Sequence, residues 1–252
     1  MEAHGASGLK TRPAEARSAA RRLRLRAQSR ERRKRFGLLL LSITTVFAVE
    51  GIASPGRLQQ VVVSILLAVT IVFSLRVADA RRVIVMPTLV VSLVLVLASI
   101  VVAIAGNPQG VVVGIFNLLL VTIAPPAIIL GTVRTLRARK QVTVEAVFGV
   151  LGLYLLLGML FAFLYAFIGR VNGGSFFAGH QPVTAASCLY FSFTTITTVG
   201  YGDLTAGSNL GHTLSNAEAL IGQIYLVTIV SMIVGNLGLR RVETADVDAA
   251  ER

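Results

Sequence analysis

The chain has no tryptophan, one cysteine and three histidines among its 252 residues. Without tryptophan, any aromatic belt at a membrane surface must depend on tyrosine. The single cysteine, Cys188, excludes an intrachain disulfide. The histidines are scattered, no Cys/His cluster has metal-ligand spacing, and no phosphate-binding glycine loop is present. We therefore expect neither an enzyme nor a bound cofactor.

Charged residues are also scarce. They make up 14% of the chain, against 54% hydrophobic residues and a mean hydropathy of +0.76. A soluble domain could not hide that much apolar surface, so we expect the bilayer to be its solvent. The net charge is +12, and 12 of the 24 Lys and Arg residues precede Phe36. Beside so much membrane sequence, this favours a topology signal or contact with anionic lipid, and we expect no nucleic acid partner.

Long apolar segments predict an all-α membrane protein. Each has close to the roughly 20 residues that cross a bilayer as a helix. A shorter segment, 184–197, lies between the last two and is too short to span, so we expect it to be a re-entrant helix. The six predicted transmembrane helices cover about residues 36–53, 61–77, 83–106, 111–133, 142–168 and 214–239.

Positive charge supports this count of six. With the N-terminus inside, 22 of the 24 basic residues fall on the cytoplasmic side, and only Arg57 and Arg170 fall outside. A missed or extra span would scramble this pattern, so we expect both termini in the cytoplasm of a multi-pass protein. The basic leader of about 35 residues has no clear cleavage site after it, so the first apolar segment is interpreted as a span, not as a signal peptide.

Five regions follow from these spans. We expect the first to be partly helical and to lie on the inner leaflet. The last is too short for an appended nucleotide-binding or Ca²⁺-binding domain. The regions are a basic cytoplasmic segment 1–35, a four-helix transmembrane domain 36–133, a cytoplasmic linker 134–141, a fifth and sixth span with their loop 142–240, and a short cytoplasmic tail 241–252.

Residues 197–203 read Thr-Thr-Val-Gly-Tyr-Gly-Asp. An ordinary strand points its successive residues to opposite sides, whereas alternating left- and right-handed dihedrals can aim successive carbonyls at one axis. Glycine takes the left-handed dihedrals without steric cost, and Gly200 and Gly202 occupy alternate positions. Such carbonyls could replace the water oxygens of a dehydrated cation, with the Thr198 hydroxyl as a further oxygen. The alternative is a glycine-containing turn in a strand-rich protein.

The longer stretch Leu189–Asp203, LYFSFTTITTVGYGD, resembles the pore loop of the potassium channel pore-domain family. The similarity covers roughly residues 142–240 and implies a pore helix followed by a selectivity filter at the outer side of the plasma membrane. One chain supplies one filter strand, and no second TVGYG is present. Because a K⁺ ringed by about eight oxygens needs four strands, the resemblance implies a homotetramer. The implied K⁺-coordinating residues are Thr198, Val199, Gly200, Tyr201 and Gly202.

Several residues near the loop are candidates for support of the filter. Tyr190 and Phe191 are expected to brace it or to pack in the membrane core, and both roles can hold. Asp203 either accepts hydrogen bonds or attracts cations. Thr184 can cap the pore helix. Glu218 is expected behind the filter with an unidentified donor. The full set of support candidates is Thr197, Asp203, Tyr190, Phe191, Thr194 and Glu218.

The last span is expected to line an inner cavity. Gly222 follows Asp203 by nineteen residues, the position of a hinge glycine in the family; close helix packing is the alternative. Gln223 suits a watery cavity, or an interhelical hydrogen bond instead. Steps of three and four residues along the helix give a predicted cavity stripe of Gln223, Leu226, Val230 and Val234.

The predicted fourth span, 111–133, contains no Arg or Lys. A voltage sensor needs several such charges within the membrane, so we expect little intrinsic voltage sensitivity. Pro125 and Pro126 should break or kink this span, and Asn117 could bond to a neighbouring helix. The leading functional hypothesis is passive K⁺ conduction. The alternatives are a K⁺ uptake transporter subunit, although such relatives carry four pore repeats in one chain, and a non-conducting membrane sensor or scaffold.

Overall fold

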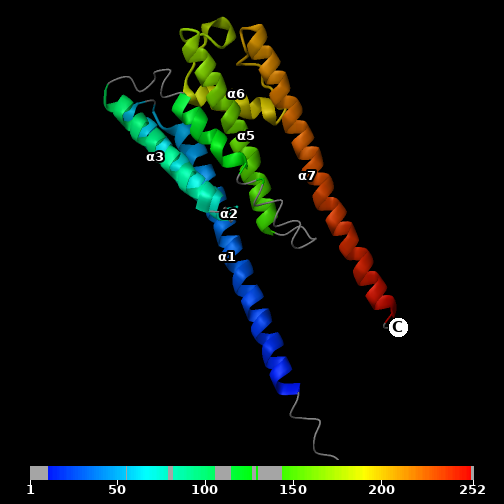
Figure 1. Ribbon diagram of the computed structural model, residues 1–252. Coiled ribbons are helices and arrows are strands. Elements are labelled where there is room, and N and C mark those ends of the chain that lie inside the picture. Colours follow the sequence, from blue (N-terminus) through cyan, green and yellow to red (C-terminus); the bar gives the residue numbers. More distant parts are fainter. Residues whose placement is uncertain are drawn as a thin grey trace, which may run out of the picture.

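The chain folds into long helices that pack along one another, as the computed structural model in Figure 1 shows. The structure describes residues 11–54, 56–78, 82–105, 115–126, 129 and 144–250, with their side chains except at 11–30, 32, 82–84, 103–104, 145–146, 230 and 232–250. Within these residues it contains helices and one isolated antiparallel bridge, between Phe177 and Ala206, and no strand. The predicted all-α class is confirmed for this part of the chain.

Four described helices are long and apolar enough to cross a membrane. Their apolar spans are Arg33–Ile52, Arg57–Val77, Val85–Val102 and Val147–Val171, which match the first, second, third and fifth predicted spans. The elements are α1 (Thr11–Ile52), α2 (Arg57–Val77), α3 (Arg82–Ile104), a shorter apolar helix (Ile115–Pro126), α5 (Val144–Val171), the 3₁₀ turn η1 (Ala178–His180), α6 (Ala185–Ile196) and α7 (Asn209–Ala250).

The predicted fourth and sixth spans differ from the observed elements. Only residues 115–126 and 129 of the fourth are described, and all of these are helical, Pro125 and Pro126 included. The rest of that span, and any kink in it, lies outside the described residues. The sixth falls within α7, which begins before Leu214 and continues to Ala250, so the predicted tail is helical up to that residue.

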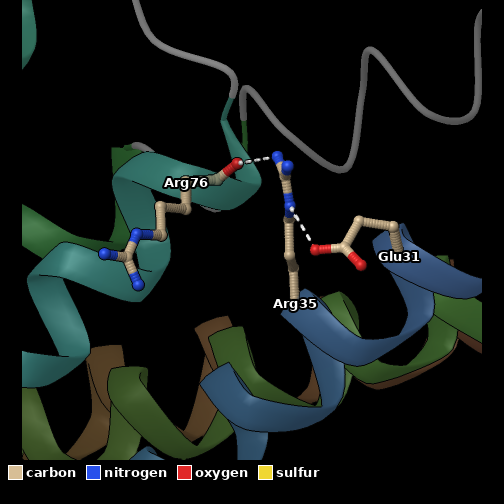
Figure 2. A network of polar contacts seen from close by, with 3 residues as sticks. All are labelled: Glu31, Arg35 and Arg76. Carbon is tan, nitrogen blue, oxygen red and sulfur yellow. Dashed lines mark hydrogen bonds and ion pairs between the residues drawn. The ribbon is translucent and has the colours of Figure 1, made fainter. Parts of the chain in front are cut away.

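Helix α1 joins the basic segment to the first span without a break. Near the predicted boundary, Arg35 donates from Nη1 to the carbonyl of Arg76 at 3.4 Å and pairs through Nε with Glu31 at 3.8 Å. Figure 2 shows this network between α1 and the last turn of α2. A guanidinium is favourable there because carbonyls at a helix C-terminus carry partial negative charge. The contact joins α1 to the C-terminal end of α2.

Polar side chains connect the first helices inside their apolar core. Ser64 of α2 lies with its hydroxyl 2.8 Å from that of Ser99 in α3, and donates to Asn117 Oδ1 at 3.2 Å. Thr70 of α2 donates to Ser42 of α1 at 3.2 Å. The expected bond from Asn117 to a neighbouring helix is therefore confirmed. Interhelical hydrogen bonds of this kind contribute about 0.6 to 2 kcal/mol each in a membrane.

Helix α5 connects α6 and α7 with the rest of the molecule. It packs on α1 along one side and on α6 and α7 along the other, and α1 also reaches α6 directly. The Phe47 ring of α1 meets Phe193 of α6 edge-on, with centroids 4.8 Å apart. The short helix α6 is thus enclosed by three longer helices, which fix its direction.

Candidate functional site

The short helix α6 is capped at both ends. Thr184 has extended dihedrals and its hydroxyl accepts from the amide of Ser187 at 3.0 Å, while Ser187 Oγ accepts from the Thr184 amide at 2.8 Å. This reciprocal pair is a capping box with serine at the third helical position. The predicted Thr184 cap is confirmed. The helix ends at Ile196, and Thr197 is its C-cap, so its partially negative end meets the start of the candidate filter.

The loop after α6 alternates its backbone handedness. Thr198, Gly200 and Gly202 have φ of 58°, 52° and 81°. Left-handed dihedrals at the two glycines agree with the sequence prediction. Thr198 is not a glycine, so its dihedral costs about 1 to 2 kcal/mol. Strain of this kind persists where the surrounding structure enforces it, and it marks functional sites more often than other places.

Backbone hydrogen bonds hold this loop to the end of the helix. The Thr198 amide donates to the Thr195 carbonyl at 2.9 Å, and the Gly200 amide donates to the Thr194 carbonyl at 3.0 Å. The Thr197 hydroxyl donates to the Phe193 carbonyl at 2.5 Å. Of the predicted support residues, Thr194 bonds to the loop through its backbone carbonyl, whereas the Thr197 hydroxyl bonds within the last turn of α6.

Side chains of the loop have little cover within one chain. Val199 is 53% exposed and Tyr201 is 71% exposed. A Cβ added at Gly200 or Gly202 would meet no atom within 4 Å. Within one chain the loop is therefore held by the backbone hydrogen bonds at its start. The side chains of Val199 and Tyr201 are left open to a neighbouring molecule.

Two tyrosines and an aspartate meet at the outer end of the loop. Tyr190 of α6 donates from its hydroxyl to Asp203 Oδ1 at 3.1 Å. Its ring stacks on Tyr201, with centroids 6.1 Å apart and planes 5° apart. Asp203 therefore accepts a hydrogen bond across the loop, one of its two predicted roles, and it remains exposed. Attraction of cations stays a prediction.

Phe191 points away from this group. It is buried in an aromatic cluster with Tyr165, Phe176 and Phe177, whose ring centroids lie 5.3 to 5.9 Å from its own. The cluster joins α5, α6 and the segment before η1. Phe191 thus packs in the core formed by α5, α6 and residues 176–177, which is one of its two predicted roles. Bracing of the filter by Phe191 stays a prediction.

Glu218 lies fully buried on α7, behind α6. Its Oε2 accepts from the Tyr165 hydroxyl at 2.6 Å, and its Oε1 accepts from Ser192 Oγ at 2.5 Å. Tyr165 belongs to α5 and Ser192 to α6, so one carboxyl group joins three helices. These two hydroxyls are the donors that sequence reasoning did not identify.

Helix α7 passes very close to the end of α6. A Cβ at Gly222 would lie 2.3 Å from the Ile196 carbonyl oxygen, and α7 is unbroken there. The structure thus shows the close packing that was the alternative for Gly222, and a hinge stays a prediction. In the predicted cavity stripe, Gln223 and Leu226 are exposed. The side chains of Val230 and Val234 lie outside the described set.

Sequence reasoning missed four hydroxyl-bearing residues around α6. They lie in apolar segments and were therefore treated as part of the hydrophobic core. A buried tyrosine or serine hydroxyl requires a hydrogen-bond partner, and this requirement could have identified them. The four are Tyr154, Tyr165, Ser192 and Tyr225.

Comparison with known proteins agrees with this geometry. Residues 149–237, about a third of the chain, match the family model described as "Ion channel". The match spans most of α5, all of α6, the loop and much of α7. This part of the chain, called the pore region below, is similar to an ion-channel family, and with four membrane-length apolar helices among its described residues the chain is a multi-pass membrane protein.

Part of the chain is also similar in sequence to a curated potassium channel. Over 82 residues the chain is 35% identical to the inward rectifier potassium channel Kirbac3.1 of Paramagnetospirillum magnetotacticum. The aligned part is 32% of this chain and 26% of that protein, so the chain spans about a quarter of the relative's length. No solved structure matches the chain significantly.

Proposed function

We propose that four copies of this chain form a channel that conducts K⁺ selectively and passively across the plasma membrane. The observation that carries the proposal is the alternation of left-handed dihedrals at Thr198, Gly200 and Gly202 directly after the C-terminal end of a capped short helix. With that alternation, carbonyls from four strands can surround a dehydrated K⁺. The permeant K⁺ is the only ion or cofactor that the proposal requires. Its ligands are the oxygens of Thr198, Val199, Gly200 and Tyr201, with Gly202 completing the filter.

Exposed apolar surface supports the tetramer. Three residues on the outer half of α7, Leu220, Ile224 and Val227, are 64 to 66% exposed in the single chain. They lie within the part that matches the ion-channel family. A neighbouring copy placed around a four-fold axis would cover such a face together with the side chains of the filter loop.

Orientation is proposed from charge. Both long helices, α1 and α7, extend beyond the other elements at the same end of the molecule (Figure 1), opposite the candidate filter. The basic part of α1 lies at that end, and Arg33 and Lys34 are exposed where the apolar span begins. We place both termini in the cytoplasm with six spans in all, and the basic helix beside anionic lipid headgroups.

The test replaces one filter glycine. Gly202→Ala adds a Cβ where no atom lies within 4 Å, so its effect comes from the φ of 81° and not from crowding. We expect the purified variant to remain tetrameric and to lose K⁺ flux in liposomes. Gly173→Ala is a matched control, because Gly173 also has a positive φ of 66° and open space but lies in the loop after α5.

The outcomes separate the candidate functions. Selective, ATP-independent K⁺ flux that Ba²⁺ blocks supports the channel. ATP-dependent uptake would favour a transporter subunit, and silence in every condition would favour a sensor or scaffold. Normal flux in Gly202→Ala would refute the filter assignment.

A further inference from the structure

The carbonyl of Ile196, the last residue of α6, has a donor on another helix. Tyr154 of α5 donates its hydroxyl to Ile196 O at 3.0 Å. Carbonyls in the last turn of a helix have no partner within that helix, so an outside donor both satisfies the group and fixes its position. Ile196 precedes Thr198, the innermost filter residue, by two positions. Because only Thr197 lies between them, a movement of this carbonyl also displaces Thr198.

Tyr154 is itself held by α7. Its ring stacks on that of Tyr225, with centroids 5.4 Å apart and planes 26° apart. The Tyr225 hydroxyl donates to the Val150 carbonyl, one turn before Tyr154 on α5, at 2.5 Å. The backbone of α7 also approaches Ile196 O, because Gly222 has no side chain there. Three helices thus meet at one carbonyl.

We propose that Tyr154 is a positioning residue of the filter and that Tyr225 connects it to α7. The inference rests on the proposed function, since it takes residues 198–202 to bind K⁺. The Tyr154 hydroxyl holds the Ile196 carbonyl and so sets the dihedrals with which the chain enters Thr198. A shift of α7 moves the Tyr225 ring, and with it the Tyr154 hydroxyl, so it changes the filter's affinity for K⁺.

The experiment measures how much K⁺ stabilises the assembled protein compared with Na⁺. An ion that binds only the folded state raises the unfolding temperature in proportion to the logarithm of its concentration over its dissociation constant. The purified full-length chain is heated in a series of K⁺ concentrations, with Na⁺ keeping the ionic strength constant. We expect K⁺ to raise the unfolding temperature of the unsubstituted protein.

Tyr154→Phe keeps the ring and its stacking and removes only the hydroxyl. We expect the K⁺ concentration that gives a fixed rise in unfolding temperature to increase about fivefold, the change equivalent to losing one neutral hydrogen bond. The unfolding temperature in Na⁺ alone should also fall, because the Ile196 carbonyl loses its donor, but by less than it falls in K⁺. Thr45→Val is the control, because it removes a hydroxyl that donates to a carbonyl within α1, away from the proposed link, while the bond to Ile196 remains. Its K⁺ dependence should equal that of the unsubstituted protein.

The link through Tyr225 needs a second comparison. Tyr225→Leu removes the stacked ring. It should reduce the rise in unfolding temperature that K⁺ causes when Tyr154 is present. In the Tyr154→Phe background it should cause no further reduction. Additive effects of the two substitutions would overturn the link. An equal loss of stability in both salts with Tyr154→Phe would show a structural role only and overturn the positioning role. Absence of any K⁺ effect in the unsubstituted protein would instead count against the proposed function itself.

Discussion

Glu218 shows at the residue scale how the pore region tolerates a carboxyl group in an apolar setting. Its two oxygens accept from Tyr165 and Ser192, and no part of it is exposed. A buried polar group is expensive unless it is paired, and a buried hydroxyl deprived of its acceptor carries the same penalty. Glu218 and its two donors therefore tie α5, α6 and α7 together, and Ser192 Oγ also lies 2.6 Å from the Gly158 carbonyl of α5.

Glu218→Ala should therefore destabilise the protein strongly. It removes the acceptor of the buried Tyr165 hydroxyl, whereas Ser192 Oγ keeps the Gly158 carbonyl at 2.6 Å. We expect a loss of about 2 kcal/mol in unfolding free energy, measured by thermal unfolding of the purified assembly. Glu31→Ala is the control, because it removes a carboxylate from an exposed pair worth at most about 1 kcal/mol. Equal effects of the two substitutions would contradict the structural role given to Glu218.

Sequence reasoning located these groups only in part. The filter glycines and the Thr184 cap were predictable because each rule acts within a few residues. Glu218 was recognisable as an ionisable group in an apolar span. Its partners were not, because Tyr165 and Ser192 lie 53 and 26 residues away on other helices. Which hydroxyl reaches the carboxyl group depends on how those helices pack.

At the scale of elements, α6 and α7 differ in how their ends are determined. The predicted segment 184–197 and the observed Ala185–Ile196 agree closely, because a capping box begins the helix and the left-handed loop ends it. No glycine or proline follows Leu239, so α7 continues after hydrophobicity ends. Helix α1 is continuous for a similar reason. Pro13 lies in its first turn, where proline is tolerated, and no glycine follows before Gly37, so nothing interrupts the helix ahead of the first span. Hydropathy located the spans but not the helix ends.

The contact between α6 and α7 predicts the effect of Gly222→Ala. A Cβ there would lie 2.3 Å from a backbone oxygen, so α7 must move away and the filter's inner end must shift. We expect lower stability and reduced K⁺ flux. Gly37→Ala is the control, because its nearest atom would be 4.0 Å away and alanine favours a helix by about 1 kcal/mol. Altered gating with unchanged stability would instead support the predicted hinge.

At the scale of the whole molecule, the first helix connects the basic segment to the pore region. The backbone of α1 is continuous from Thr11 to Ile52. Near its end, a Cβ at Gly51 would lie 3.5 Å from Leu189 of α6, and Phe47 packs on Phe193. These contacts could not be predicted from sequence, because apolar periodicity shows which face of a helix is buried but not which other helix packs against it. They place α1, a membrane-length helix outside the matched ion-channel part, directly against α6.

Weak voltage dependence is the expectation for the assembled protein. Each charge that crosses the membrane field contributes about 2.3 kcal/mol per 100 mV, and residues 111–133 contain no Lys or Arg to move. Open probability in single-channel recordings should therefore change little between negative and positive potentials. A steep change, abolished by neutralising Arg134 and Arg137, would show that charge at the end of this span moves through the field.

The reversal potential of the reconstituted protein, with K⁺ on one side of the bilayer and an equal concentration of Na⁺ on the other, tests the central claim most directly. If backbone oxygens of Thr198 to Gly202 replace the water around a bare K⁺, the current should reverse tens of millivolts from zero, in the direction that marks preference for K⁺. Reversal at zero would mean that Na⁺ passes as readily as K⁺, and would contradict the account.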